Sequence, residues 1–392
     1  MDRIIFHIDV NSAFLSWEAT RMVKAGLPDI RLVPSAVGGD PNSRTSIVSA
    51  KSIPAKKYGI TTGEPVSLAL RKCPELVVVP PDFELYRKCS QAFIAICREY
   101  APLLEQFSID ECFLDMTGTQ LIYPDIIATA HEIKDKIRDE LGFTVNVGVG
   151  SNKLLAKMAS DFEKPDKVHT LFTDEIEKKM WPLPIGDLLF AGKAAQTKLI
   201  ANHIRTIGDL AKLDERYVKS LLGEKMGASL YAYSHGIDDS PVSEEWEDAK
   251  SYSMSTTLEE NVVTCERAYE ILHMLSESVS AKMRRDNAFT TCVSVTIRST
   301  EFVNKSHQRS LYNPTDVTAD IYEVARELFN ELWDGKTPLR LLNVCLSNIT
   351  REEYSQISLF EDPSREKSRK IDKMMDELHD KFGKNVVKRG QN

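Results

Sequence analysis

Three acidic residues stand where a protein could hold divalent metal ions. Asp9 ends a near-continuous apolar run that predicts a strand covered on both faces. Asp110 and Glu111 stand side by side between two apolar segments, which together predict a hairpin. If these strands are neighbours, three carboxylates converge, and hard cations such as Mg²⁺ would relieve their repulsion. Two such ions about 4 Å apart suit phosphoryl or nucleotidyl transfer.

Spacing alone leaves a second interpretation open. An acidic pair at a hairpin tip is usually just solvated, and an aspartate at a strand end commonly forms a turn or caps a helix. Neighbouring residues of a flat strand point to opposite faces, so Asp110 and Glu111 can share a site only at a strand end or turn. The pattern places them at such a turn, and the metal site depends on how the strands are arranged.

The elements that must position these acids alternate between strands and helices. Apolar periodicity and the placement of glycine and proline predict a strand over 4–9, helices over 13–24 and 83–100, a hairpin over 104–116, a helix over 124–141, a strand over 144–150 and a helix over 152–162. This order predicts an α+β layer, in which an antiparallel or mixed sheet carries helices on one face.

The second half of the chain predicts a separate α+β unit behind an acidic linker. Residues 172–236 indicate short helices interrupted by glycines, and residues 238–248 contain six acids without Lys or Arg. Beyond them the pattern predicts a helix over 264–285, a strand over 289–299, an edge segment over 302–311, a helix over 316–333, a strand over 339–349 and a polar helix over 362–382.

Composition sets the class of protein. A chain of 392 residues suggests two or three domains. No apolar run approaches the roughly 20 residues of a membrane span, and no secretory leader is evident, so we expect a cytoplasmic protein without a membrane partner. The seven cysteines form no CxxC pair or zinc-like cluster, which favours reduced thiols. The net charge of −8 argues mildly against a nucleic-acid partner, but three lysines gather within 51–57.

Three motifs along the first half point to one known family. FHIDVNSAFLSWE at 6–18, FSIDECFLD at 107–115 and VGVGSNKLLAKMASDFEKPD at 147–166 resemble motifs of the Y-family (translesion) DNA polymerases, in particular the bacterial polymerase IV/UmuC-like branch. The resemblance implies a multidomain right-hand polymerase: palm (1–19 and 81–171), fingers (20–80), helical thumb with helix-hairpin-helix (172–236), linker (237–249), α+β little finger (250–350) and tail (351–392).

The resemblance also implies roles in the catalytic centre. Asp9, Asp110 and Glu111 would hold two Mg²⁺ ions, with the Val10 carbonyl completing one shell. Phe14 stands where the family has its steric gate, an aromatic ring that excludes a ribose 2′-OH by clash. From the helical pattern alone, Phe14 is equally well an ordinary core residue.

Lysines are expected to hold the triphosphate. Lys153, Lys157 and Lys164 share one face if a single helix runs through all three, although spacing alone also suits a solvated face. The family places a triphosphate-binding lysine at Lys164.

The fingers depart from the family pattern at the triphosphate site. Many members carry a Tyr and an Arg where this chain has Ile53 and Lys56. Lysine is a point charge without the bidentate fork of arginine, and isoleucine donates no hydrogen bond. Part of the grip could therefore come from Lys51 or Lys57.

Two further segments resemble DNA-binding parts of the family. Residues 188–213 resemble a helix-hairpin-helix, with Gly192 and Lys193 at the turn and Phe190 in place of the usual first glycine. Residues 299–311 resemble the DNA-facing edge of the little finger, which makes Arg298, Lys305 and Arg309 expected phosphate contacts. Asn343 stands where a glycine is common, and a turn with positive φ is expected there.

The tail holds one more motif. Gln356, Leu359 and Phe360 in QISLF resemble the bacterial sliding-clamp binding peptide, which docks from a disordered segment. The expected partners are therefore primer–template DNA, dNTP and the clamp, and the expected state is a monomer.

These features predict a DNA-directed DNA polymerase of the translesion type, which transfers nucleotides to a primer 3′-OH with two metal ions. Fingers of only about 60 residues offer little surface to check the base pair, which predicts low fidelity. A scaffold that binds DNA and the clamp without catalysis stays open, favoured slightly by the departures in the fingers. A third interpretation is a nucleotide cyclase with a palm-like fold. It is disfavoured, because a cyclase needs neither thumb, little finger nor clamp peptide.

Overall fold

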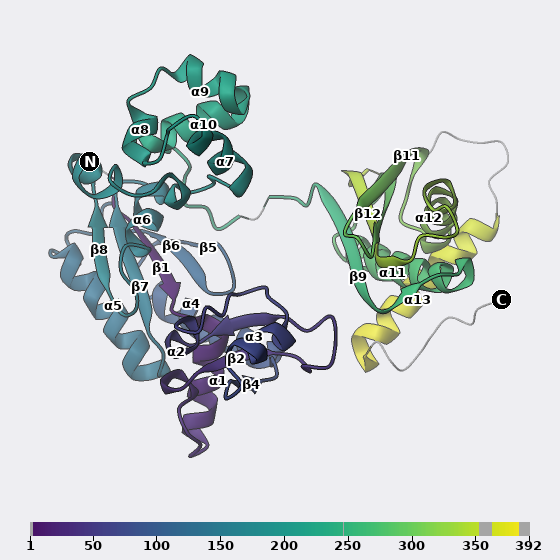
Figure 1. Ribbon diagram of the computed structural model, residues 1–392, viewed down its shortest axis with the longest axis horizontal. Coiled ribbons are helices and arrows are strands. Elements are labelled where there is room, and N and C mark those ends of the chain that lie inside the picture. Colours follow the sequence, from purple (N-terminus) through teal and green to yellow (C-terminus); the bar gives the residue numbers. More distant parts are fainter. Residues whose placement is uncertain (1–2, 246, 353–362, 384–392) are drawn as a thin grey trace. The chain divides into compact units, whose positions relative to one another are not determined.

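The computed structural model describes residues 3–245, 247–352 and 363–383. The chain divides into two compact units, Met1–Trp246 and Glu247–Asn392, and each is described by itself (Figure 1). The division falls inside the predicted linker. None of the described helices is long and apolar enough to cross a membrane.

A mixed five-stranded sheet forms the centre of the first unit. Its strands are β1 (Ile5–Val10), β5 (Leu103–Gln106), β6 (Glu111–Asp115), β7 (Val145–Gly150) and β8 (Val168–Leu171). Their order is β5-β6-β1-β7-β8, so β1 lies in the middle and pairs antiparallel with both β6 and β7. The acid-bearing strand and hairpin are therefore neighbours, which is the arrangement that the metal site requires.

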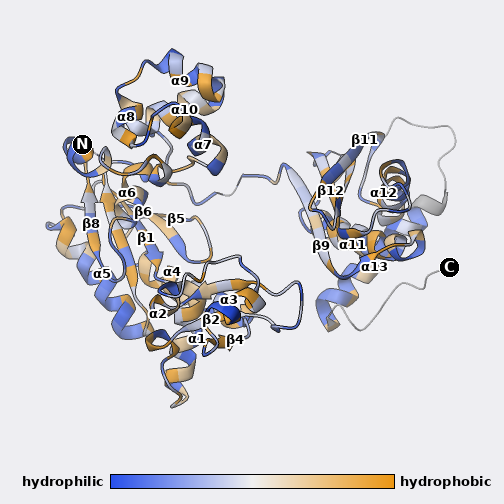
Figure 2. Cartoon of the chain, viewed as in Figure 1, coloured by the Kyte–Doolittle hydropathy of each residue, from blue (hydrophilic) through white to orange (hydrophobic). Residues whose placement is uncertain are grey.

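Helices cover both faces of this sheet. Apolar residues of β1, Phe6 and Ile8 among them, share one core with α1 (Ala13–Lys24), α4 (Phe83–Arg98) and α5 (Ile126–Leu141). Figure 2 shows that the visible side of α5 is mostly hydrophilic, as its position on the outside of this layer requires. On the opposite face, Ile5 packs with Ala156 of α6 (Lys153–Ser160). The expectation of helices on one face is therefore wrong, because α6 lies on the side that holds Asp9.

Two glycines let α6 approach the sheet. A Cβ at Gly148 of β7 would lie 1.9 Å from the carbonyl oxygen of Ala156, and one at Gly150 would lie 2.7 Å from the Ala156 nitrogen. Real Cβ atoms do not come so close to backbone, so only glycine permits this packing. The close approach brings Lys153 and Lys157 of α6 beside Glu105 of β5 and Glu111 of β6.

The first half of the predicted linker belongs to the first unit. Val242 is 5% exposed and packs with Ile5 and Phe113 of the palm sheet. The backbone N–H of Ser243 donates to Glu105 Oε2 at 3.1 Å. Residues 238–243 therefore pack against the palm instead of forming a free linker.

Fingers and thumb complete the first unit. The fingers contain a small sheet in the order β3-β2-β4 with two short helices: β2 (Ser35–Gly38), β3 (Val48–Lys51), α2 (Ile53–Lys56), α3 (Val66–Lys72) and β4 (Val77–Val79). The thumb is helical and has its own core: α7 (Lys193–Ala201), α8 (Ile207–Ala211), α9 (Glu215–Leu222) and α10 (Glu224–Ser234). Short 3-10 or π turns occur at Ile30–Leu32, Thr173–Glu175, Ile176–Met180 and Ile185–Asp187.

The second unit is an antiparallel sheet with helices packed on it. Its elements are β9 (Ser251–Val262), α11 (Cys265–Arg285), β10 (Phe289–Ser299), β11 (Asn304–Thr315), α12 (Thr318–Leu332) and β12 (Leu339–Thr350). The strand order β11-β10-β12-β9 makes β11 an edge strand, as expected for residues 302–311. The sequence pattern did not reveal β9, whose residues are mostly polar.

The expected turn at Asn343 is wrong. Asn343 lies within β12 between Thr296 of β10 and Ser255 of β9, and its Nδ2 donates to Ser253 Oγ at 2.7 Å. The positive φ belongs instead to Asn348, at 51°.

The tail helix α13 (Pro363–Phe382) is attached to the second unit by charge. Arg284 Nε donates to Asp376 Oδ2 at 2.7 Å. Asp372, which is 3% exposed, accepts from the backbone N–H of Thr318 at 2.9 Å and so caps the start of α12. These buried contacts make α13 part of the domain.

Candidate active site

Two of the three predicted metal ligands face each other on neighbouring strands. Asp9 of β1 and Glu111 of β6 are direct partners in the antiparallel register. Opposed residues point to the same face, so both carboxylates lie on the face that carries α6. Asp110 occupies the turn, where its carbonyl accepts from the Val10 N–H at 3.0 Å and its carboxylate accepts from Ser108 Oγ at 2.6 Å. The predicted hairpin is present as the antiparallel pair of β5 and β6, but Glu111 begins β6 and does not share the turn with Asp110 as expected.

Lysines neutralise Asp9, Glu111 and the neighbouring Glu105. Each of the three predicted lysines pairs with one of these acids: Lys164 with Asp9 at 2.5 Å, Lys153 with Glu105 at 2.7 Å, and Lys157 with Glu111. The predicted single-helix stripe is wrong, because α6 ends at Ser160 and Lys164 lies beyond it.

A buried amide holds the turn that carries Lys164. Asn146 of β7 is fully buried, and its Nδ2 donates to the carbonyls of Ser160 at 3.0 Å and Glu163 at 2.7 Å. Its Oδ1 accepts from Asn11 Nδ2 at 3.1 Å. Asn146 is also the partner of Asp9 in the pairing of β1 with β7. Its backbone therefore lies beside Asp9, while its side chain holds the turn that carries Lys164.

Burial and neighbouring charges shift the two acids in opposite directions. Burial raises the pKa of Asp9 to about 6, although Lys164 opposes the shift. Burial also acts to raise the pKa of Glu111, but bonds from His7 and Lys157 outweigh it and lower that pKa to about 2. The charged form of Glu111 is therefore held strongly, whereas Asp9 carries an unfavourable buried charge that an added cation would relieve.

An unpredicted histidine lies beneath Glu111. His7 is 1% exposed; its Nε2 lies 3.1 Å from Glu111 Oε2 and its Nδ1 lies 2.7 Å from Ser160 Oγ. Burial lowers the pKa of His7 to about 4, so its ring is neutral near pH 7. A neutral ring that donates from Nε2 to Glu111 leaves Nδ1 as an acceptor beside Ser160 Oγ, whose hydroxyl also has the Lys157 carbonyl within bonding distance at 2.8 Å. His7 stands two residues before Asp9 on the same strand. Because side chains alternate between the faces of a strand, this spacing is the sequence signal from which its position beside Asp9 could have been predicted.

The donors suit hard divalent cations. Asp9, Asp110 and Glu111 supply oxygen ligands only, the class that Mg²⁺ prefers. Among residues 3–245, 247–352 and 363–383, no three His, Cys, Asp or Glu side chains are grouped closely enough to hold one ion. The lysine ammonium groups instead neutralise Asp9 and Glu111, so bound cations would have to take over that role from Lys164 and Lys157.

A pocket of about 300 Å³ joins the acids to the fingers. Its lining comes from the end of β1, the start of α1 and the fingers: Asp9, Val10, Ser12, Ala13, Phe14, Ser49, Ala50, Lys51, Lys56, Thr62 and Asp110. Acids, the predicted gate and two lysines thus line one cavity, although they lie up to about one hundred residues apart in sequence.

Phe14 is half-buried at the edge of this pocket. Its ring stacks on Tyr86 of α4 with centroids 4.5 Å apart and planes 9° apart. The Tyr86 hydroxyl donates to the buried Glu18 at 2.9 Å, and Arg21 donates to the same carboxylate at 2.6 Å. The ring of Phe14 is therefore supported from below while its other side lines the pocket.

The fingers place the two candidate lysines differently. Lys56 lines the pocket, as does Lys51, whereas Lys57 is exposed and does not. Ile53 is 49% exposed at the start of α2, where Ser52 caps the helix by accepting from the Ala55 N–H. It contributes nothing to the lining of the pocket.

The predicted thumb hairpin is present. Gly192 precedes α7, and both Gly192 and Lys193 are exposed at the start of that helix. Phe190 adopts φ 64° and is 60% exposed, so a residue with a Cβ occupies a left-handed position that favours glycine. Gly223 joins α9 to α10 with φ 88°.

The three basic residues of the little finger lie on two faces. Lys305 and Arg309 oppose Ile297 and Val293, whose side chains are in the core beneath the helices. Arg309 pairs there with Glu327 and Glu331 of α12.

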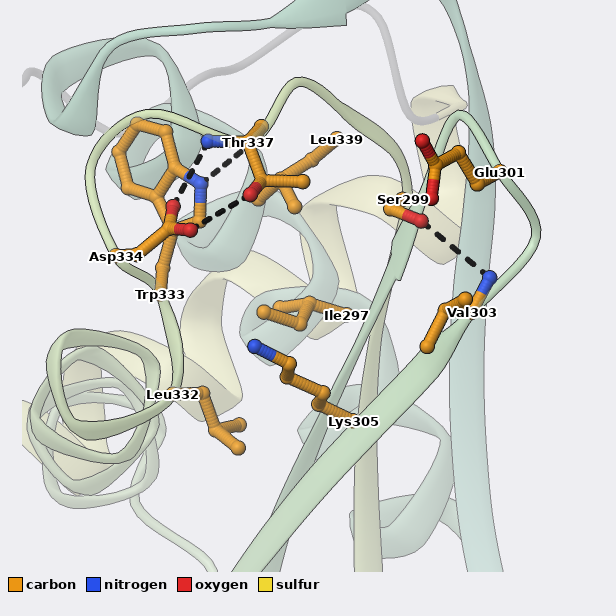
Figure 3. A pocket seen from close by; sticks show the side chains of 10 residues that line it. All are labelled: Ile297, Ser299, Glu301, Val303, Lys305, Leu332, Trp333, Asp334, Thr337 and Leu339. Carbon is orange, nitrogen blue, oxygen red and sulfur yellow. Dashed lines mark hydrogen bonds between the residues drawn. The ribbon is translucent and has the colours of Figure 1, made fainter.

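Lys305 enters a cavity on that same side. It reaches into a space of about 190 Å³ beside Trp333 and Asp334 (Figure 3). Arg298 instead lies on the open face, and its Nε donates to Asn304 Oδ1 at 2.7 Å. Of the three, only Arg298 faces away from the helices.

The clamp-binding motif cannot be placed. Gln356, Leu359 and Phe360 lie outside the described residues.

Family models match most of the chain. The impB/mucB/samB family model matches residues 8–161, and the model of that family's C-terminal domain matches residues 249–359. A model described as the DNA polymerase-iota thumb domain matches residues 191–238.

Curated relatives match over nearly their full length. DNA polymerase IV of Clostridium acetobutylicum is 45% identical over 390 residues, which cover 99% of this chain and 98% of the relative. DNA polymerase IV 1 of Bacillus subtilis is 37% identical over 391 residues, which cover 99% of this chain and 92% of the relative.

A solved structure confirms the expected fold. A Y-family DNA polymerase chimera of Dbh and Dpo4 is 22% identical and aligns with a TM-score of 0.77 over 89% of this chain and 100% of that chain. The right-hand α+β architecture predicted from the motifs is thereby confirmed. The family models, the curated relatives and this solved structure agree. The chain therefore belongs to the impB/mucB/samB family of Y-family DNA polymerases, in the branch of DNA polymerase IV.

Proposed function

We propose that this chain is a DNA-directed DNA polymerase of the translesion type, which extends a primer–template with dNTP. The observation that carries the proposal is the shared pocket, whose palm side bears Asp9 and Asp110 and whose fingers side bears Lys51 and Lys56. Relatives that share up to 45% of its residues are named DNA polymerase IV. The primer 3′-oxygen attacks the α-phosphorus, the bond to the β-phosphate oxygen breaks, and pyrophosphate leaves.

The palm acids are assigned to two Mg²⁺ ions. Asp9, Asp110, Glu111 and the Val10 carbonyl would hold them, and bound ions supply charge stabilisation to the attacking and leaving oxygens. Lys157 and Lys164 neutralise Glu111 and Asp9 when no cation does so. Bound cations would release Lys157 and Lys164 from this role, and their ammonium groups would then be available to the triphosphate, with Lys164 also paired to Asp161 at 2.8 Å.

Phe14 is assigned to sugar selection. It lines the pocket from the first turn of α1, and the stacked Tyr86 ring prevents it from yielding toward the core. A rigid ring at this place excludes an added 2′-OH by clash, which is an effective form of discrimination.

DNA contacts are assigned to the thumb and the little finger. The exposed N–H groups at Gly192 and Lys193 suit a phosphate of the duplex, because a helix start favours anions without reading sequence. Arg298 faces the open side of the little-finger sheet and suits a second phosphate, whereas Arg309 is already paired with two glutamates. Lys305 is a weaker candidate because its side chain lies on the helix side of the sheet, in the cavity beside Trp333. Gln356, Leu359 and Phe360 would bind the sliding clamp and keep a monomeric enzyme near primer ends.

Primer extension tests the assignment of the acids. We expect the wild-type chain to extend a primed template with Mg²⁺, and Asp110→Ala and Glu111→Ala each to lose more than about a thousandfold, because both ligate the ions. Glu140→Ala, an exposed acid on α5, should extend normally. Full activity in either palm variant would remove the metal assignment. DNA binding without any incorporation by the wild type would favour the scaffold.

A further inference from the structure

A row of basic side chains on β11 ends at a cavity of the second unit. Lys305, His307 and Arg309 alternate along the strand, so their side chains share the face that carries α12. His307 Nδ1 lies 2.7 Å from Glu331 Oε2, and Arg309 pairs with Glu327 and Glu331. Lys305 is exposed and instead lines a cavity of about 190 Å³ at the end of α12.

Apolar side chains from four segments form walls of this cavity. They come from β10, the turn before β11, the end of α12 and the start of β12 (Figure 3): Ile297, Val303, Leu332, Trp333 and Leu339. Sites for whole small-molecule ligands usually enclose about 300–1,000 Å³. The smaller space here therefore suits a single apolar side chain, such as that of leucine or phenylalanine.

The Lys305 ammonium is available to a partner from outside the chain. Asp334, at the same cavity, already accepts from the Thr337 N–H at 2.8 Å and from Thr337 Oγ1 at 2.6 Å. The Trp333 indole N–H donates to the Thr337 carbonyl at 2.8 Å. Among the residues that the structure describes, none places a carboxylate within ion-pairing distance of Lys305. An acid brought by a ligand would complete the row of ion pairs along β11.

Exposed apolar surface adjoins the cavity. Phe302 is 63% exposed and the next residue, Val303, is 53% exposed. Phe302 adopts φ 63°, a left-handed conformation that is unfavourable for a residue with a Cβ, and the Arg340 guanidinium lies 5.0 Å from the centre of its ring. Strained backbone of this kind gathers at binding sites and switch regions. The turn thus holds a large apolar ring in solvent beside a cavity that can take another.

We propose that this cavity binds a segment of a partner protein in which a leucine or phenylalanine stands beside one aspartate or glutamate. The apolar side chain fills the cavity, and the neighbouring carboxylate pairs with Lys305. An apolar anchor in a pocket with a polar rim is the usual arrangement of the residues that dominate protein–protein binding. DNA is less suited, because its phosphates would meet the carboxylates of Glu301 and Asp334, which line the same cavity.

Titration of the full chain with a dipeptide tests the site. The probe is N-acetyl-aspartyl-phenylalanine amide, and its asparaginyl counterpart lacks the charge. The readout is the nuclear magnetic resonance signal of the Trp333 indole N–H, one of four tryptophans in the chain. We expect saturable binding of the aspartyl probe and about tenfold weaker binding of the asparaginyl probe, the typical effect of losing one charge-assisted hydrogen bond. No saturable shift with the aspartyl probe would overturn the proposal.

Variants of the lysine separate its charge from the shape of the cavity. Lys305→Met should bind the aspartyl probe about tenfold more weakly and no longer distinguish it from the asparaginyl probe. Lys305→Arg keeps the charge and should retain the distinction. Lys336→Met removes an exposed lysine that does not line the cavity, so it is the matched control and should bind as the wild type does. An undiminished preference for the aspartyl probe in Lys305→Met would refute the pairing.

Competition with DNA distinguishes the two kinds of occupant. Arg298, the expected phosphate contact, faces away from the helices, whereas the cavity lies on the helix side of the sheet. A saturating primer–template duplex should therefore leave binding of the aspartyl probe unchanged within about twofold, well below the tenfold effect of the charge. Displacement of the probe by the duplex would assign the cavity to DNA and would exclude the protein segment.

Discussion

His7 ties Glu111, a proposed metal ligand, to the helix that faces it. Its ring bridges Glu111 on β6 and Ser160 at the end of α6, and it is 1% exposed. A carboxylate that accepts a hydrogen bond from a fixed imidazole loses rotational freedom before any ion binds. Residues that hydrogen-bond to metal ligands orient those ligands in the same way in metal sites generally. His7 therefore acts as a positioning residue for Glu111 and does not itself reach the pocket.

Replacing His7 should raise the Mg²⁺ concentration that primer extension requires, with little effect on the fold. His7→Gln keeps a donor but not the bridge to Ser160, so we expect the Mg²⁺ concentration for half-maximal extension to rise about tenfold, the lower end for such supports. Ser160→Ala should raise it less, because the ring stays in place. Mn²⁺ binding to the free protein, followed by electron paramagnetic resonance, should weaken in parallel. An unchanged Mg²⁺ requirement in His7→Gln would rule out the positioning role.

At the scale of elements, the contact between α6 and β7 decides the geometry of the site. Gly148 and Gly150 let the helix backbone touch the strand, and α6 carries Lys153, Lys157 and the terminal Ser160. Every bond from this helix to the acids depends on that distance, because the lysine and serine partners sit on its sheet-facing side. The glycines are thus as necessary to the site as the charged residues.

A methyl group at Gly148 should therefore disrupt both stability and activity. It would lie 1.9 Å from the carbonyl oxygen of Ala156 and 2.4 Å from the nitrogen of Ser160, so α6 must move. We expect Gly148→Ala to lower the free energy of unfolding of the first unit by about 3 kcal/mol, the upper range for overpacking. Denaturant unfolding measures this change.

Gly192→Ala is the matched control for Gly148→Ala. A Cβ at Gly192 meets no atom within 4 Å, and its φ of −65° suits alanine. Its unfolding free energy should change by less than about 1 kcal/mol, the cost of altering a cap residue. Equal stability of both variants would contradict the packing of α6 on β7.

At the scale of the whole molecule, the chain consists of two units with separate cores. The palm core gathers side chains such as Phe93, and the core of the second unit gathers side chains such as Leu342. The tail helix α13 belongs to the second unit, where Arg284 holds it through Asp372 and Asp376. Each unit therefore has the means to fold and unfold by itself.

Calorimetry should resolve this independence. We expect at least two thermal transitions, because each unit has a core of its own. Leu342→Ala should lower the transition of the second unit by roughly 5–15 °C, since removing a buried leucine costs about 2–5 kcal/mol. Phe93→Ala should lower the other transition and leave that of the second unit unchanged. A single transition that both variants shift together would show that the units unfold as one.

The sequence by itself determined the kind of chemistry and most of the elements. Apolar periodicity located β1, α1 and the helix α4 to within a few residues, because local side-chain pattern decides which segments can bury one face. The motifs around Asp9 and Asp110 indicated the family, and the comparisons confirmed it. The polar strand β9 escaped prediction, since its place in the sheet depends on a partner that lies far away in the chain.

Only the tertiary structure decided which side chains meet. It paired Lys164 with Asp9, placed His7 under Glu111, and chose Lys51 over Lys57 for the pocket. These contacts join segments that are separated by up to about 150 residues, and their geometry follows from strand register and from the close packing of α6. Register and packing are set by the burial of whole faces at once, so no local window of sequence contains them.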